Sequence, residues 1–293
     1  MTVDRRQFAQ AVGAIIGCAF AGAAFASTAM TAADLVERIK AKLLAEGTKW
    51  QPSYTDGFKV GDPATIVKGV AVTFEATLDV LQQAVARGFN FIICHEAVFW
   101  AGFDAPQILK GDPIRLAKEA FVREHGLVIW RLHDHMHRMQ PEPVISSLLH
   151  ELGWTPYYEK GGRRFDHIEV PEIQLGRLAS HMQTKLGTAN VVVVGDPGMP
   201  VRSVGVGIHI LSTLLPVLHK SDVVIVGETS EYDSFEYVRD AVALGQKKGL
   251  IRISHERLEE WGVRYFAAWA RPLIAPLPFA WLSTGDAFSI QAA

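Results

Sequence analysis

Two stretches of the chain share one pattern of apolar and polar positions. Residues 60–72 read VGDPATIVKGVAV and residues 194–206 read VGDPGMPVRSVGV. They match at the Val-Gly-Asp-Pro start, at a later valine followed by a basic residue, and at two alternating valines. The alternation predicts strands over 68–74 and 201–208. Asp62 and Asp196, in the repeated VGDP, are predicted to form turns.

A helix and a second strand are predicted after each copy. In the first copy, a helix over about 76–87 precedes the apolar strand 89–94; in the second, a shorter helix over 212–219 precedes the strand 222–226. The apolar spacing of Leu78, Leu81 and Val85 supports the first helix, and Gly88 can end it in a left-handed conformation.

The correspondence continues through a further helix and strand, in residues 112–132 and 234–254. Strands joined by helices are expected to be parallel with right-handed crossovers. The sequence therefore predicts an α/β protein with two similar lobes from an internal duplication and mostly parallel sheets. We place the lobes at 31–155 and 156–293, and the lobes may exchange segments.

Ionisable side chains follow three of the predicted strands. His95 and Glu96 end the first apolar run, His133-Asp134-His135-Met136-His137 ends the next, and the last strand runs into His255 and Glu259. Ligands bind beyond the carboxyl ends of parallel strands. On a helix, His255 and Glu259 would project from one face, at a spacing that lets both reach one ion.

Each motif alone has an ordinary structural explanation. His95 could be a hydrogen-bonded strand-end histidine, and His255 with Glu259 a surface pair. His133, His135 and His137 would point one way on an extended chain, but could equally belong to a solvated loop. Their shared position after apolar strands favours a metal site, and mixed nitrogen and oxygen donors favour zinc, iron or manganese.

Composition narrows the classes of partner. The chain has 293 residues, of which 49% are hydrophobic, and a formal net charge of -2. This balance offers no basic field for nucleic acid, so no nucleic-acid partner is expected. No phosphate-binding loop, dinucleotide fingerprint or nucleophile elbow is present in the sequence.

The N-terminus predicts export. Arg5 and Arg6 precede an uncharged Ala/Gly-rich stretch that ends in Ala24-Phe25-Ala26, the layout of a signal peptide cleaved after residue 26. The arginine pair resembles a twin-arginine signal, which implies passage through the twin-arginine export machinery in folded form and a periplasmic location. An uncleaved membrane anchor and lipidation at Cys18 are the alternatives. Cleavage would leave Cys94 as the only cysteine, so no internal disulfide is expected.

The ordered motifs resemble one known group, the Nif-three-like dinuclear metal proteins, some of which are called type two GTP cyclohydrolases. The resemblance runs from DGFKVGD near residue 56 through VTFEATLDVLQQAVARGFNFIICHEAVFW and VIVGETSE to ISHERLE. It implies two α/β lobes, a cleft between them that holds two divalent metal ions, and a homohexamer.

The resemblance also implies a ligand set, with two departures. The metal ligands would be His95, Glu96, His137, His255 and Glu259. Glu96 stands where the family pattern has a second histidine, and His137 stands where it has an aspartate. The two exchanges offset each other, since three imidazoles and two carboxylates remain.

These expectations predict that the protein is a metal-dependent hydrolase acting on a small-molecule substrate. Two ions would lower the pKa of a bound water and stabilise charge on the substrate, with Glu259 bridging them. His133 is expected to orient a ligand or shuttle protons, and Glu228 to be its acidic counterpart. The alternative is a non-catalytic metal-binding or interaction protein of the periplasm.

Overall fold

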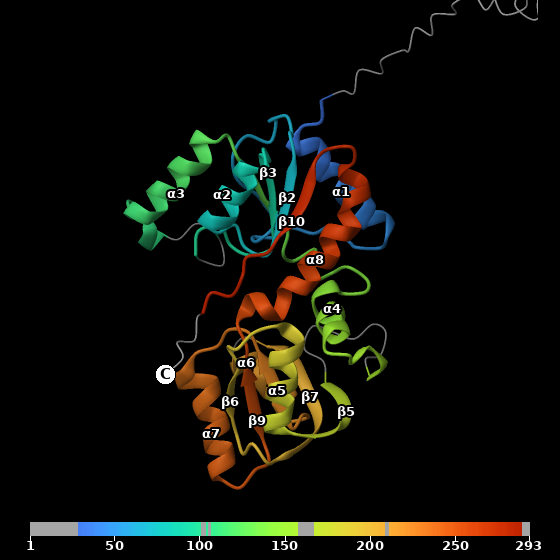
Figure 1. The fold of residues 1–293 in the computed structure, drawn as a ribbon, viewed down its shortest axis with the longest axis vertical. Coiled ribbons are helices and arrows are strands. Elements are labelled where there is room, and N and C mark those ends of the chain that lie inside the picture. Colours follow the sequence, from blue (N-terminus) through green and yellow to red (C-terminus); the bar gives the residue numbers. More distant parts are fainter. Residues whose placement is uncertain (1–28, 101–103, 105–106, 158–166, 209–210, 289–293) are drawn as a thin grey trace, which may run out of the picture.

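The protein folds into two α/β lobes, one above the other, as Figure 1 shows for the computed structural model. The structure describes residues 29–100, 104, 107–157, 167–208 and 211–288. The predicted signal peptide, residues 1–26, lies outside the described residues. The two-lobe α/β architecture confirms the predicted fold class.

Eight helices are present in the described residues, and those predicted from the sequence, at 76–87, within 112–132, at 212–219, within 234–254 and at 255–259, are among them. They are α1 (Ala32–Ala45), α2 (Leu78–Ala86), α3 (Pro113–Glu124), α4 (Pro143–Glu151), α5 (Leu175–Leu186), α6 (Leu211–Leu218), α7 (Glu236–Ala243) and α8 (His255–Ile274). Three short helical turns, at Gln107–Leu109, Thr155–Tyr157 and Glu231–Phe235, complete the set.

Each lobe is built on a five-stranded sheet. The first sheet has the order β1-β4-β3-β2-β10 and the second the order β5-β7-β8-β9-β6. The strands are β1 (Gly57–Val60), β2 (Val70–Thr73), β3 (Phe91–Cys94), β4 (Val128–Arg131), β5 (His167–Gln174), β6 (Val192–Val194), β7 (Pro200–Ile208), β8 (Val223–Val226), β9 (Gly249–Arg252) and β10 (Phe279–Leu282).

The repeated sequence gives the two sheets a common core. The strand order β1-β4-β3-β2 in the first sheet corresponds to β6-β9-β8-β7 in the second. In each set of four strands the first pair is antiparallel and the other two pairs are parallel. In both VGDP copies the aspartate accepts a backbone N–H two residues on, from Ala64 at 2.9 Å and from Gly198 at 2.8 Å. The predicted Asp62 and Asp196 turns are therefore confirmed.

The fifth strand distinguishes the lobes. In the first sheet β10, from the C-terminal part of the chain, lies parallel to β2, whereas in the second β5 lies antiparallel to β7. Residues 279–282 thus complete the sheet of the first lobe, although they belong to the part of the chain predicted to form the second. The sequence analysis allowed for such an exchange of segments between the lobes. The bounds 31–155 and 156–293 stay a prediction.

One local expectation was wrong. The inward face of α2 is formed by Val80, Leu81 and Ala84, while Leu78 is 42% exposed. Leu78 is the first residue of the helix, directly after the N-cap Thr77, and its side chain is not covered as those of the later turns are. The predicted helix stop is confirmed, because Gly88 has φ +74°.

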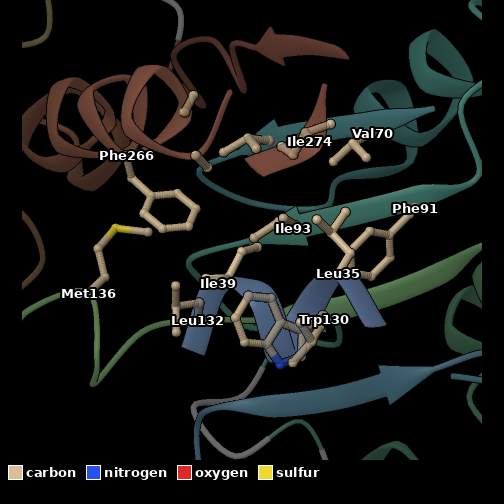
Figure 2. Close-up of a cluster of buried hydrophobic side chains, with 14 of the residues drawn as sticks. Leu35, Ile39, Val70, Phe91, Ile93, Trp130, Leu132, Met136, Phe266 and Ile274 are labelled. Carbon is tan, nitrogen blue, oxygen red and sulfur yellow. The ribbon is translucent and has the colours of Figure 1, made fainter. Parts of the chain in front are cut away.

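The helices that follow the last repeated strands are exchanged between the lobes. α4 follows β4 of the first lobe, yet its Ile145 and Leu148 belong to the apolar core of the second lobe. α8 follows β9 of the second lobe, yet its Phe266 and Ile274 pack in the core of the first lobe, among residues such as Ile93 (Figure 2). Each lobe is therefore completed by a helix from the other.

The exchanged helices cross at Gly262. A Cβ atom at this position would lie 2.5 Å from Cα and 2.8 Å from N of Val144, at the start of α4. Only glycine permits this approach, because the obstacle is backbone that cannot rotate away. Among the described helices, none is long and apolar enough to cross a membrane.

We predict that Gly262→Ala destabilises the protein by about 1–3 kcal/mol, because the methyl group forces α8 away from α4. Urea and thermal unfolding of the purified protein would measure the loss. Ala268→Ser, an exposed change of similar size on the same helix, should stay within about 0.5 kcal/mol of wild type. Equal unfolding midpoints for the two variants would contradict a tight helix crossing.

Candidate metal centre

The three predicted motifs converge between the lobes. His95 and Glu96 directly follow β3, and the turn that holds His133 and His137 follows β4, so these side chains lie at the carboxyl edge of the first sheet. His255 and Glu259 lie in the first turns of α8 and face the same point. Of the predicted site residues, only Glu228 lies at the margin.

Three histidines form one side of the centre. His95, His133 and His137 each offer a ring nitrogen, and these nitrogens lie within 4.8 Å of one another. The ring centroids are 4.6 to 4.9 Å apart. His95, Glu96 and Glu259 form a second group with donor atoms within the same limit. His95 belongs to both groups and therefore lies between the other donor residues.

The ring orientations follow one rule. In each histidine, Nδ1 faces an oxygen on the outer side: the Leu132 carbonyl at 3.2 Å from His95, Asp134 at 2.9 Å from His133, and Glu142 at 2.7 Å from His137. Nδ1 of His255 also faces a carboxylate, that of Glu228, but at 3.7 Å, which is beyond hydrogen-bond distance. Metal-binding histidines are usually oriented by such an outer hydrogen bond, which leaves Nε2 to bind the ion.

The Glu259 carboxylate lies between two imidazoles. Its Oε2 is 3.2 Å from Nε2 of His95 and 3.3 Å from Nε2 of His255. The Glu259 side chain is 1% exposed and that of His95 is fully buried. A carboxylate in this position can be shared by two ions.

The surroundings of His95 fit a cation better than a proton. Both of its ring nitrogens face oxygen atoms that accept hydrogen bonds, so a metal-free ring would need two N–H groups. Burial, together with the nearby charge of His133, lowers the pKa of His95, which favours a neutral ring with a single N–H. A cation between Nε2 and the Glu259 carboxylate would resolve this conflict. The donor set therefore fits a divalent metal ion.

Two of the histidines, His133 and His255, hold protons strongly when no ion is bound. Burial lowers the pKa of His133, but hydrogen bonds with Asp134 and Glu96 outweigh this and raise the pKa to about 9. Burial likewise lowers the pKa of His255, and the Glu259 carboxylate raises it to about 9. Burial acts to raise the pKa of Glu96, but contacts with the histidines reverse this and lower it to about 2.

Arg131 fixes Glu96 on the side away from the histidines. Its Nη2 is 3.0 Å from Oε2 of Glu96, while Oε1 of Glu96 lies 3.3 Å from Nε2 of His133. The guanidinium also donates to the His95 carbonyl at 2.9 Å and lies 3.3 Å from Asp104. Glu96 therefore presents one oxygen to the centre, and the other is held by a buried arginine.

Asp56 builds the turn that carries His133 and His137, and the sequence did not identify this role. Its carboxylate accepts the backbone N–H groups of His133, Asp134 and His135, at 2.5 to 2.9 Å. Asp56 lies in the DGFKVGD stretch, but that motif gives no sign that it meets residues 133–135 in space. The roles of Arg131 and Glu142 were missed for the same reason.

The sequence left open whether His133, His135 and His137 lie on an extended chain, where they would point one way, or in a solvated loop, and the structure shows neither arrangement. The segment forms a turn, and the fully buried His135 points to the opposite side, where it binds Asp56 and stacks on Trp50 at 3.7 Å between centroids. Its Nε2 accepts the Gln51 N–H at 2.9 Å. His135 is therefore a structural residue.

The second lobe contributes less to the centre than the first. Gly227 follows β8 as His95 follows β3, and a Cβ atom there would lie 3.1 Å from Cα of His255. The missing side chain thus lets the start of α8 approach the centre. Glu228 is 69% exposed on its side chain and borders the centre next to His255.

Access to the centre is narrow. The side chains of Glu96, His133 and His255 are 13 to 18% exposed and form its open side. A cavity of about 530 Å³ lies elsewhere, at the outer edge of the first lobe between β1 and α3, and Lys59, Asp62 and Arg115 are among its lining residues. Because that cavity contains no histidine, we place the chemistry at the buried cluster.

Comparison with known proteins agrees with this architecture. Solved structures with the same fold include a Bacillus cereus protein related to NIF3 (TM-score 0.68, 13% identity, 90% of this chain and all of the other). Staphylococcus aureus protein SA1388 gives a TM-score of 0.66 at 17% identity, over 90% of this chain and 99% of the other. Reduced HcgD from Methanocaldococcus jannaschii gives 0.61 at 14% identity, over 87% and 97%.

Sequence comparison identifies the family. A curated relative, a GTP cyclohydrolase 1 type 2 homolog of Chlamydia pneumoniae, is 38% identical over 77 residues. This match covers 26% of the chain and 30% of the relative's length. The family model described as Duf34/NIF3 (NGG1p interacting factor 3) matches residues 30–272. This chain, with its two-lobe fold and its cluster of side chains that could hold a metal ion, therefore belongs to the DUF34/NIF3 family.

Proposed function

We propose that the protein is an exported metal-dependent hydrolase with a dinuclear centre. The observation that carries this proposal is the position of Glu259, whose Oε2 lies 3.2 Å from His95 and 3.3 Å from His255. Two imidazoles within 3.3 Å of one carboxylate oxygen form, together with that carboxylate, a donor set that would suit divalent ions. Divalent ions held there would activate water and stabilise negative charge on a substrate.

The chain's own residues supply the remaining functions. When no ion is bound, His133, with a pKa raised to about 9 by Asp134 and Glu96 against the effect of burial, can hold a proton at Nε2 and release it at the open side of the centre as an ion binds. Glu228 borders the same opening and can orient His255 through Nδ1. The narrow opening favours a small-molecule substrate.

A second candidate is a non-catalytic metal-binding protein of the periplasm. The observation that favours it is the burial of the donors, since His95 and Glu259 are 0 and 1% exposed on their side chains. One oxygen of Glu96 is also engaged by Arg131. Such a site could hold ions firmly and offer a substrate little room.

Export and assembly belong to the same proposal. The twin-arginine-type segment 1–26 supports passage across the inner membrane in folded form, which suits a protein that acquires ions before export. A hexamer is proposed from the family resemblance alone.

We predict that the mature protein binds two divalent ions per chain and that His255→Ala and Glu259→Ala each remove at least one of them. Elemental analysis would give the stoichiometry. A panel of nucleotides, phosphoesters and amides would test turnover, which should fall at least about 100-fold in both variants. His219→Ala, an exposed histidine outside the cluster, is the matched control. Tight binding without turnover on any substrate would favour the second candidate.

We predict that metal uptake releases protons at neutral pH. His133 and His255, with pKa values of about 9, are protonated at pH 7 when no ion is bound. The apparent affinity should therefore rise as pH increases towards 9, by about tenfold per unit for each proton displaced. Calorimetry in buffers of different ionisation enthalpy would count these protons. An affinity that is constant between pH 7 and 9 would contradict the assignment.

The same two histidines predict how stability depends on pH. Their pKa values in the folded state exceed the ordinary value of 6.5, so their ion pairs stabilise the metal-free protein fully below pH 6.5. This contribution is lost as pH rises through 9. The melting temperature of the metal-free protein should fall over that range, and that of the metal-loaded protein should fall less.

We predict that Arg5→Lys together with Arg6→Lys retains the protein in the cytoplasm, because twin-arginine export requires the arginine pair. Cell fractionation would locate the protein, and N-terminal sequencing of the exported form should begin at Ser27. A Lys42→Arg variant, changed at a partly exposed position of α1 far from the signal segment in sequence, should be exported normally. Export that survives loss of both arginines would point to another route.

A further inference from the structure

The side of the centre formed by His95, His133 and His137 differs from the side formed by Glu259 and His255. The three imidazole nitrogens lie within 4.8 Å of one another, and all three residues belong to the first lobe. They follow two neighbouring strands, β3 and β4, which pair in parallel from Phe91 to Cys94. The first lobe alone therefore supplies this group.

The ring of His133 is held as firmly as the rings of its neighbours. Its Nδ1 lies 2.9 Å from Asp134, whose other oxygen accepts the Ser53 hydroxyl at 2.9 Å. The backbone of the turn is fixed by Asp56. His133 thus has the outer carboxylate and the fixed backbone that are expected of a metal ligand.

His137 is oriented by a residue with a second structural task. Glu142 binds Nδ1 of His137 at 2.7 Å through Oε1, and its Oε2 accepts the Ile145 N–H at 2.6 Å as the N-cap of α4. Any rotation of Glu142 away from His137 would cost the helix its cap. This arrangement directs Nε2 of His137 towards the other two rings.

We propose that His95, His133 and His137 form a three-imidazole site that binds one late transition-metal ion, with His133 as a direct ligand. The ligand set implied by the family resemblance does not include His133. Three imidazoles suit Zn²⁺, Co²⁺ or Cu²⁺, whereas Mg²⁺ and Mn²⁺ prefer carboxylate and water oxygens. The other side, with Glu259 and His255, takes the second ion more weakly. The inference rests on the proposed metal centre but requires no hydrolytic activity.

The experiment counts nitrogen ligands on the first ion bound by the full mature protein. One equivalent of Cu²⁺ should give an electron paramagnetic resonance spectrum with coupling to three imidazole nitrogens. In His133→Ala one nitrogen should be lost, and Co²⁺ titration followed by visible absorption should show a fall in affinity of at least about 100-fold. His133→Gln, which keeps more of the side-chain volume, serves if the alanine variant unfolds.

A matched variant separates the two sides of the centre. Glu259→Gln should retain the first ion with three nitrogens and lose the second. An unchanged spectrum and affinity in both His133 variants would overturn the proposal, as would loss of the first ion in Glu259→Gln. If the three-nitrogen spectrum is found but no substrate is turned over, the hydrolase proposal fails and the three-imidazole site stands.

Discussion

The close crossing of α4 and α8 at Gly262 is the constraint on which the rest of the structure depends. α4 completes the core of the second lobe and α8 completes that of the first, so neither lobe buries its apolar surface without the other. A side chain at Gly262 would collide with the Val144 backbone and separate the helices. Because α8 begins at His255, the same crossing places His255 and Glu259 opposite the strand ends of the first lobe.

The cost of burying charge explains the composition of the centre. Burying carboxylates and imidazoles is unfavourable unless they are paired. On the outer side Arg131 balances Glu96 and Asp104, and the histidines donate through Nδ1 to oxygen acceptors. On the inner side, nitrogen atoms and carboxylate oxygens face one another. Protons on His133 and His255 neutralise part of the negative charge of the carboxylates on this side, and divalent ions would neutralise more of it.

The two departures from the family pattern are each supported by a neighbouring residue. Glu96 is paired with Arg131 on β4, and His137 is paired with Glu142 at the start of α4. Exchanging an imidazole for a carboxylate on one side, and the reverse on the other, preserves the total charge and changes its distribution. In our proposal the result is a centre with a nitrogen-rich side and an oxygen-rich side.

The sequence by itself determined the local features, because these depend on residues close together in the chain. The repeated VGDP, the strands that end at His95 and at His133, and the helical spacing of His255 and Glu259 were all evident from apolar periodicity and turn chemistry. The tertiary structure alone decided the exchange of α4 and α8, the place of β10, the buried position of His135 away from the centre, and the pairing of Asp56, Arg131 and Glu142 with the centre. These contacts join residues from separate elements, and a periodic pattern carries no information about which distant element a side chain will meet.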